Sequence, residues 1–134
     1  AHVFNTQQET CRKLLEAVGE VVWVENEELI DIVTALSGGG PAYVFLLTEC
    51  MAQAGIDAGL PAKLSNQLAR VTVSGAGELM HKSNEKPAIL RQNVTSRGGT
   101  TAEALKILMA ENGFQSLMTE AIAAATARSK ELAY

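Results

Sequence analysis

Residues 41–58 read PAYVFLLTECMAQAGIDA, and this stretch decides the fold class. Pro41 suits the first turn of a helix, where its missing N–H and its fixed φ are tolerated. The residues that follow are apolar on nearly every side of a helical wheel, which is typical of a helix buried by several neighbours. We expect SGGG at 37–40 to break the chain before this helix, and Gly59 to end it. The stretch therefore predicts a central helix in an all-α domain.

Apolar residues recur at helical spacing on both sides of this stretch. Their pattern predicts further helices over 27–36, 61–81, 87–93, 101–111 and 114–132. Aromatic residues make up only 4% of the sequence while Ala, Gly and Leu are abundant, a balance that favours closely packed helices over sheets. We therefore predict an all-α fold, a helical bundle of about six helices.

The first 25 residues carry a different pattern. Residues 5–18 predict an amphipathic helix that Gly19 stops, and Val21–Val24 form the one good strand candidate. A lone strand cannot satisfy its own backbone groups, so we interpret it as part of a sheet that this sequence does not contain. The sequence begins at Ala1 rather than at Met, as we expect of a fragment or a processed product.

Composition and charge exclude several classes of function. The net charge is -4 and no Lys/Arg cluster is present, which argues against nucleic-acid binding. Cys11 and Cys50 are isolated, so we expect neither a metal site nor a disulfide. The longest apolar run, residues 41–47, is too short to span a bilayer, and no secretory signal is visible. We expect a cytoplasmic protein that does not enter a membrane.

The helix that begins at Pro41 also predicts an assembly. A single layer of neighbours in so small a domain cannot cover a helix that is apolar on nearly every face. Gly75 and Gly77 form a patch of small residues within another predicted helix, which suits close approach by a further helix. We therefore predict an obligate homodimer with intertwined helices, and leave a higher oligomer of dimers open.

The stretch NVTSRGGTTAEAL at 93–105 is the most informative for chemistry. Thr100 and Glu103 have the spacing of a capping box ahead of an apolar helical run. Gly98 and Gly99 allow the backbone to turn tightly just before that helix. Unpaired N–H groups at a helix start, together with the helix dipole, favour an anion.

Three hydroxyl groups surround this helix start, from Ser96, Thr100 and Thr101. The residues predict a pocket for a carboxylate or a phosphate that contains no general base of ordinary strength. An ordinary capped helix without any ligand remains the alternative interpretation of the same residues.

Several motifs in order resemble the pyrroline-5-carboxylate reductases. PAILRQNVTSRGGTTAEALKIL at 87–108 is similar to the signature of that family, and TALSGGGPAYVF at 34–45 is similar to the opening of its dimerisation domain. GLP at 59–61 and the end of the chain, 121–132, also fit. The resemblance covers essentially the whole chain. It implies that residues 1–25, a helix plus an orphan strand, are the tail of a nucleotide-binding Rossmann domain, and that residues 26–134 form a helical dimerisation and substrate-binding domain.

The resemblance also implies roles for the loop residues. Ser96, Gly98, Gly99 and Thr100 would hold the substrate carboxylate, and Thr101, the implied catalytic residue, would face the imine nitrogen. A threonine hydroxyl is a weak acid, but it can orient the ring and pass on a proton from water. The hydride would come from NAD(P)H in the full-length enzyme, with the choice between NADH and NADPH left open. We expect these 134 residues alone to bind no cofactor and to be inactive.

The implied activity is therefore the reduction of 1-pyrroline-5-carboxylate to L-proline, in proline biosynthesis. Two residues depart from the family pattern: Gly39 stands where Ser is usual, and Arg97 where Pro is usual. The first removes a hydroxyl, and the second places a cation beside the expected carboxylate. A non-catalytic helical dimerisation module is the alternative function. The helical domain of a β-hydroxyacid-type dehydrogenase is a more distant one, because its G-x-x-x-K pattern is not found here.

Overall fold

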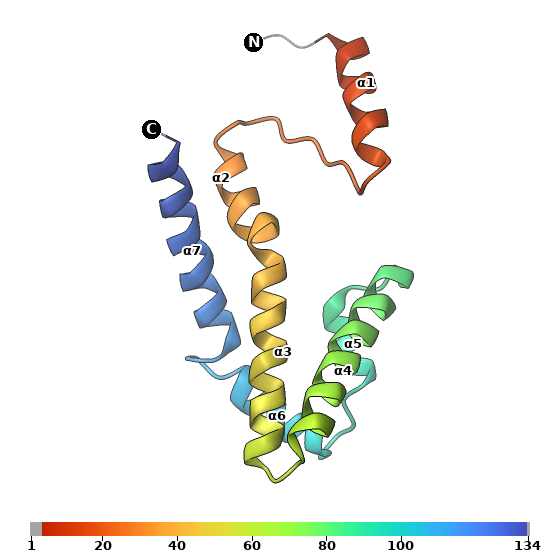
Figure 1. The fold of residues 1–134 in the computed structure, drawn as a ribbon, viewed down its shortest axis with the longest axis vertical. Helices are drawn as coiled ribbons and strands as arrows, with labels where there is room; N and C mark the ends of the chain where they lie inside the picture. The colour runs from red at the N-terminus through yellow and green to blue at the C-terminus, as the bar shows by residue number, and fades with distance from the viewer. Residues whose placement is uncertain (1–3, 134) are drawn as a thin grey trace. The chain divides into compact units, whose positions relative to one another are not determined.

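The computed structural model describes residues 4–133, and the chain divides into two compact units at the boundary between Ile30 and Asp31. The first unit contains α1 (Asn5–Glu16). In chain order after it, the helices are α2 (Leu29–Val33), the π-helix η1 (Thr34–Gly38), α3 (Gly40–Asp57), α4 (Ala62–Lys82), α5 (Pro87–Asn93), α6 (Thr100–Leu108) and α7 (Phe114–Leu132) (Figure 1). The predicted all-α fold is confirmed.

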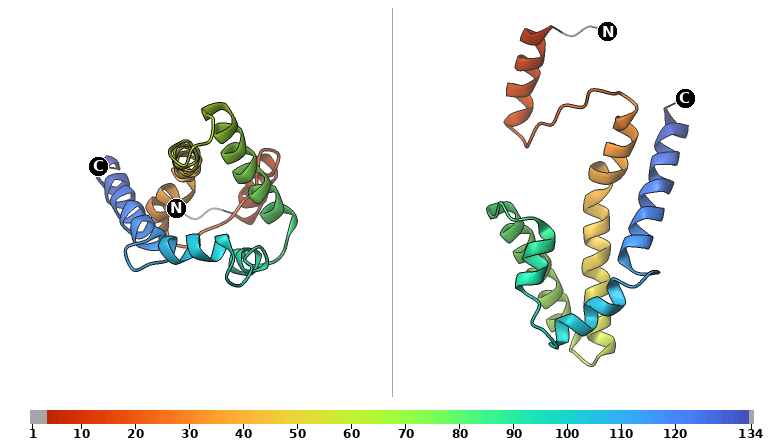
Figure 2. Two further views of the ribbon diagram at one scale, coloured as in Figure 1. Left: turned by 90° about the horizontal axis from the view of Figure 1, so that it is seen from below. Right: turned by 180° about the vertical axis from the view of Figure 1, so that it is seen from behind.

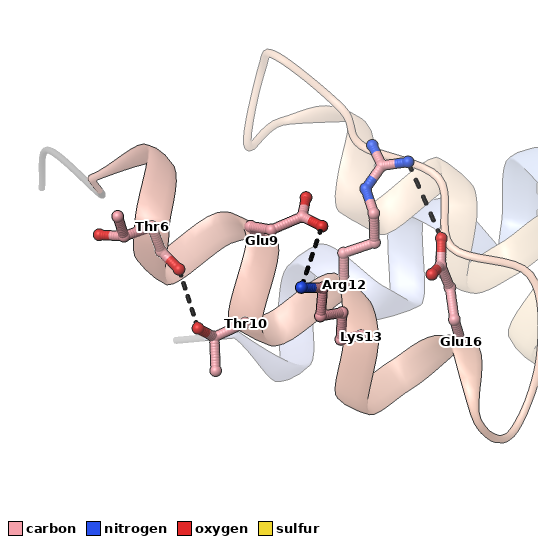
Figure 3. A network of polar contacts seen from close by, with 6 residues as sticks. All are labelled: Thr6, Glu9, Thr10, Arg12, Lys13 and Glu16. Atoms are coloured by element: carbon pink, nitrogen blue, oxygen red, sulfur yellow. Dashed lines mark hydrogen bonds and ion pairs between the residues drawn. The ribbon is translucent and has the colours of Figure 1, made fainter.

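Helix α1 is stabilised by hydrogen bonds and ion pairs among its own residues. Thr10 donates its hydroxyl to the carbonyl of Thr6 at 2.9 Å. Two exposed ion pairs at i,i+4 spacing, Glu9 with Lys13 and Arg12 with Glu16, have N–O distances of 3.9 and 3.8 Å (Figure 3). Such pairs stabilise a helix by about 0.2–0.5 kcal/mol each. No residue of α1 is buried, so its apolar side chains remain uncovered.

The strand predicted at Val21–Val24 does not form. Residues 20–24 have no regular secondary structure, and the described range 4–133 contains no strand. The reason is the missing partner strand, which already made this segment unusual in the sequence. A strand is defined by its ladder to a neighbour, and these residues have no second strand to pair with.

The break predicted at SGGG, residues 37–40, is also wrong, because the backbone continues helically through it. Gly39 has φ -79° and ψ -18°, and its N–H donates to the carbonyl of Thr34 at 3.0 Å, the spacing of a π-turn. A proline in a helix clashes with the carbonyl four residues before it, and a widened turn relieves that clash ahead of Pro41. Tyr43 closes the turn by donating its hydroxyl to the carbonyl of Ala35 at 2.9 Å.

The continuous turn makes one long apolar helix out of α2, η1 and α3. The run Leu29–Asp57 has 29 residues and a mean hydropathy of 1.4, which is long and apolar enough by length and composition to cross a membrane. The apolar helix is therefore much longer than the run 41–47 that the sequence predicts, because the helix does not end at the glycines. Core helices of soluble proteins satisfy the same criteria. The apolar surface of this helix can therefore be buried by protein or by lipid.

A tight hairpin joins α3 to α4, and the two helices separate with distance from their connection (Figures 1 and 2). Gly59 has φ +103°, a conformation that favours glycine. Close to the turn, Ser65 donates its hydroxyl to the carbonyl of Ala52 at 2.6 Å. A Cβ atom on Gly55 would lie 2.2 Å from that hydroxyl oxygen, so the close approach of the helices requires a glycine there.

The C-terminal helix α7 lies along η1. Ser129 donates its hydroxyl to the carboxylate of Asp31 at 2.6 Å, which joins residues 98 positions apart in the chain. Neither α5 nor α6 makes a comparably extensive contact with another of the described elements. Both short helices are therefore held mainly by their connections.

The described part of the chain has almost no hydrophobic core. Its buried apolar residues are three alanines, Ala35, Ala52 and Ala69, with exposed fractions of 3–5%. The chain exposes 11222 Å², whereas a folded monomer of 14.2 kDa exposes about 6,800 Å². Large side chains such as Phe45 and Leu36 are 65% and 61% exposed. These helices are arranged to pack against something more than themselves.

Candidate functional site

A tight turn precedes α6 and gives the candidate site its form. The N–H of Gly99 donates to the carbonyl of Ser96 at 3.0 Å, and Gly98 has φ +71°. Positive φ at the third position is the mark of a type II turn, in which the third residue is usually glycine. A Cβ on Gly99 would lie 3.2 Å from the Ser96 carbonyl oxygen, which is tighter than an ordinary contact. The backbone conformation therefore favours glycine at Gly98, whereas a side chain at Gly99 would require the Ser96 carbonyl to shift slightly.

The predicted capping box does not form. Helix α6 has Gly99 at its N-cap with φ -82° and ψ 172°, and no side chain caps the helix. Thr100 is the first helical residue, so its hydroxyl is one position too late to reach the N–H groups that a cap would satisfy. Glu103 pairs instead with Lys106 at 2.7 Å. With Gly99 as the N-cap, Glu103 is the fourth helical residue rather than the third, so it is out of register for a capping box.

The missing cap leaves donors available. Ala102 and Glu103 donate their N–H groups to the Gly99 carbonyl at 3.0 and 3.3 Å. Within residues 4–133, the N–H groups of Thr100 and Thr101 have no such acceptor. Two unpaired donors at the positive end of a helix dipole are suited to an anionic group.

The three predicted hydroxyl residues, Ser96, Thr100 and Thr101, lie on the turn and the first residues of α6, and all three are exposed. No described group accepts or donates a hydrogen bond with their side chains. Thr95, one residue earlier, is different, because it donates its hydroxyl to the carbonyl of Arg91 at 2.6 Å and so ends α5. The structure therefore brings the predicted site residues together on one turn and leaves their polar groups unused.

The residues that support this turn were not singled out from the sequence. Arg91 on α5 contacts the sulfur of Met109 just beyond α6, and Asn93 donates its side-chain amide to Glu85 at 3.1 Å. The Arg91 contact joins α5 to the residue that follows α6, and the Asn93 bond joins the end of α5 to the loop before it. A threonine just after the last turn of a predicted helix is the signal that could have pointed to the hydrogen bond from Thr95 to the carbonyl four residues earlier.

The charge at the site is simple. Arg97 is exposed and makes no ion pair within the described chain, so its guanidinium is available near the start of α6. No group of three or more His, Cys, Asp or Glu residues is placed to hold a metal ion in the range 4–133. The turn thus offers N–H donors, hydroxyls and one cation. It can bind and orient a small anion, and it contains no strong acid or base.

A family model described as pyrroline-5-carboxylate reductase dimerisation matches residues 27–132. This range includes the hairpin of α3 and α4 and the whole candidate site. The chain belongs to this family.

Individual relatives agree. The pyrroline-5-carboxylate reductase of Pseudomonas aeruginosa is 45% identical over 133 residues, which cover 99% of this chain and 48% of the relative. The pyrroline-5-carboxylate reductase of Arabidopsis thaliana is 42% identical over 119 residues, covering 89% of this chain and 42% of the relative. The chain therefore spans less than half the length of these curated relatives.

Solved structures of pyrroline-5-carboxylate reductases have the same fold. The reductase from Coxiella burnetii matches with a TM-score of 0.90 at 39% identity, covering 97% of this chain and 48% of that one. A pyrroline carboxylate reductase from Plasmodium falciparum, crystallised with NADP bound, matches with a TM-score of 0.81 at 34% identity, covering 99% of this chain and 50% of that one. The resemblance inferred from the sequence motifs is confirmed.

Proposed function

We propose that this chain is the substrate-binding and dimerisation half of an NAD(P)H-dependent reductase that converts 1-pyrroline-5-carboxylate to L-proline. One observation carries the proposal: the turn Ser96–Gly99 and the uncapped start of α6 place unpaired N–H groups and hydroxyls together, within the region that matches the family. A small cyclic imine with one carboxylate needs such a set of donors. Residues 26–134 are the helical domain in this proposal, and residues 1–25 are the tail of a nucleotide-binding domain.

The proposed roles follow from what each group can donate. Ser96 and the backbone of Gly98, Gly99 and Thr100 hold the carboxylate, because N–H and hydroxyl donors at a helix start stabilise negative charge. Thr101 directs its hydroxyl to the ring nitrogen and orients the imine carbon for reduction. The nitrogen gains a proton during the reaction, and Thr101 can pass it on from water, since the hydroxyl both donates and accepts.

The described residues do not fit a dinucleotide. Residues 4–133 contain no strand followed by a glycine-rich turn and a helix, which is the unit that binds the pyrophosphate. We therefore assign the cofactor to another part of the full-length reductase and derive no step through it. The NADP named in the Plasmodium structure supports a nicotinamide cofactor for the full-length protein.

A homodimer is part of the proposal. A groove of about 720 Å³ follows α7 and η1, with Leu36, Met118 and Ile122 among its lining residues. The space around Gly75 and Gly77 on α4 is open, so another helix can approach closely there. The excess exposed area leaves ample apolar surface for an interface of more than ~2,000 Å² in total, the size of an obligate one. The family description, which names dimerisation, supports a second copy as the cover.

Two acidic residues argue for a protein rather than a lipid cover of the long helix. Asp31 and Glu49 lie within the 29-residue run Leu29–Asp57, where a bilayer would disfavour both charges. Asp31 also accepts the hydroxyl of Ser129 from α7, so that side of the run already packs against protein. We accordingly propose a cytoplasmic protein that stays outside membranes.

The test is steady-state kinetics of the full-length reductase with pyrroline-5-carboxylate and NADH or NADPH. Thr101→Ala should lower kcat by roughly tenfold to a hundredfold and raise KM less, because the hydroxyl matters most as the charge on nitrogen changes. Thr72→Ala on α4, an exposed threonine outside the turn, is the matched control and should leave both constants unchanged.

Two results would count against the proposal. Absence of cofactor oxidation by a folded full-length protein would favour the non-catalytic dimerisation module. A pure KM effect of Thr101→Ala would reduce Thr101 to a binding residue.

A further inference from the structure

The segment that contains the candidate site is basic, although the chain as a whole is acidic. Residues 87–108, from the start of α5 to the end of α6, contain three basic residues, Arg91, Arg97 and Lys106, and one acidic residue, Glu103, whereas the net charge of the chain is -4. Glu103 and Lys106 neutralise one another as an ion pair with an N–O distance of 2.7 Å. The charge of the two arginines is therefore uncompensated within this segment, which favours the approach of an anion.

The two arginines differ in what they contact. Arg91 is half-buried, and its guanidinium donates to the sulfur of Met109. Arg97 is exposed, and within residues 4–133 its side chain makes neither an ion pair nor a hydrogen bond. Arg97 is thus the cation that a ligand can reach without breaking an existing contact.

Arg97 also lies next to the donors of the candidate site. It is the second residue of the Ser96–Gly99 turn, which leads directly into the unpaired N–H groups of Thr100 and Thr101. A tight turn brings residues that are three positions apart close together. The turn and the start of α6 therefore place one full positive charge beside a set of neutral donors.

We propose that Arg97 is a specificity-determining residue, whose guanidinium pairs with the substrate carboxylate held by the N–H groups at the start of α6. The inference rests on the proposed function, and it names the charge that selects a cyclic imine with a carboxylate over the same ring without one. A guanidinium binds a carboxylate through charge-assisted hydrogen bonds, which are about twice as strong as those between neutral groups. The proline that is usual at this position in the family has neither a charge nor a side-chain donor.

The proposed contact has a kinetic signature of its own. The carboxylate takes no part in the reduction, so its charge is the same in the substrate and in the transition state. A contact to the carboxylate stabilises both states equally, and its loss raises KM without lowering kcat. Thr101, which is proposed to face the imine nitrogen, should affect kcat instead. The kinetics of the two residues should therefore differ in kind.

The experiment is steady-state kinetics of the full-length reductase with Arg97→Gln and Arg97→Lys. Arg97→Gln should raise the KM for pyrroline-5-carboxylate roughly threefold to tenfold and leave kcat unchanged, since an exposed ion pair contributes less than a buried one. Arg97→Lys retains the charge and should recover part of that loss. Lys63→Gln removes one exposed charge from α4, outside the turn, and should leave both constants unchanged.

Two further measurements separate pairing with the carboxylate from support of the turn. Added salt should raise the KM of the wild type more than that of Arg97→Gln, because salt screens exposed charges. 1-Pyrroline is the same cyclic imine without the carboxylate, and its kcat/KM should be equal in the wild type and in Arg97→Gln. This ratio is measured below saturation, so weak binding of 1-pyrroline does not prevent the comparison.

Three results would overturn the inference. A wild-type KM in Arg97→Gln would show that the guanidinium does not meet the carboxylate. An equal loss of kcat/KM with pyrroline-5-carboxylate and with 1-pyrroline would mean that Arg97 supports the turn instead. The proposed function stands in both cases, because the wild type still reduces pyrroline-5-carboxylate. A folded wild-type protein without turnover would remove the proposed function, and this inference with it.

Discussion

Arg97 occupies the second position of the Ser96–Gly99 turn, where proline is the favoured residue of a type II turn. Its φ is not positive, and its N–H makes no backbone hydrogen bond in the part of the chain that the structure describes. Neither observation opposes a proline, and the second position of a type II turn has the φ of about -60° that proline adopts. Arg97 therefore replaces the family's usual proline at a position that would accept one. The change adds a positive charge and removes the restriction that proline places on the backbone.

Replacing Arg97 by proline should stabilise the protein. The change restricts the unfolded chain without removing a hydrogen bond, and such substitutions raise the free energy of unfolding by about 0.4–1 kcal/mol. Urea denaturation at one fixed protein concentration measures the effect, since dimerisation makes stability depend on concentration. Arg97→Ala is the control and should lack the gain. A loss of stability in Arg97→Pro would show that the turn is not of type II.

For individual residues, the sequence predicted which ones lie together at the site, but not which hydrogen bonds they make. Ser96, Gly98, Gly99, Thr100 and Thr101 do lie together, because a glycine turn before an apolar helical run has few other conformations. The capping box was misplaced by one residue, since Gly99 and Thr100 are both acceptable N-caps and only the backbone geometry decides between them. The support from Arg91 to Met109 depends on tertiary placement, which no local pattern encodes.

Among the elements, the α3–α4 hairpin depends on a close approach at Gly55. An alanine there would place its Cβ 2.2 Å from the hydroxyl oxygen of Ser65, a buried residue with an exposed fraction of 2%. Gly55→Ala should therefore destabilise the protein by about 1–3 kcal/mol, as overpacking does, even though alanine is the better helix former. Thermal or urea unfolding measures the loss.

A double-mutant cycle tests the stated cause. Ser65→Ala alone should cost about 0.5–1.5 kcal/mol, for the lost hydrogen bond to Ala52. In the Ser65→Ala background, Gly55→Ala should cost less than it does alone, because the atom it would meet at 2.2 Å is gone. Strictly additive effects would mean that the clash is not the source of the destabilisation.

The helices were largely predictable and the connections were not. Each predicted helix has a counterpart, because apolar spacing is a strong signal in the long helices and Pro87 marks the start of the short one. The glycines at 37–40 were misread as a break, since glycine lowers helix propensity locally while the packing of Tyr43 against Ala35 is invisible in the sequence. The strand at Val21–Val24 failed for the opposite reason, because its local propensity was correct and its partner strand is not in the described residues.

For the whole molecule, the inventory of parts predicts what the 134-residue chain can do alone. It carries the turn at Ser96–Gly99 and the apolar helices, but its described residues contain no dinucleotide-binding unit. The isolated chain should fold, dimerise and bind a small carboxylate weakly, and should oxidise neither NADH nor NADPH with pyrroline-5-carboxylate. Supplying the nucleotide-binding domain in the same protein should restore turnover. Turnover by the purified chain, free of host reductase, would contradict the assignment of cofactor binding to another domain.

In the proposed homodimer, the exposed apolar faces of this chain pack against those of a second copy. The most direct test is the mass of the purified 134-residue chain at micromolar concentration, measured by light scattering with circular dichroism to confirm that it is folded. We predict a stable helical species of about 28 kDa, twice the 14.2 kDa of one chain. A stable, folded monomer of 14.2 kDa would contradict the claim.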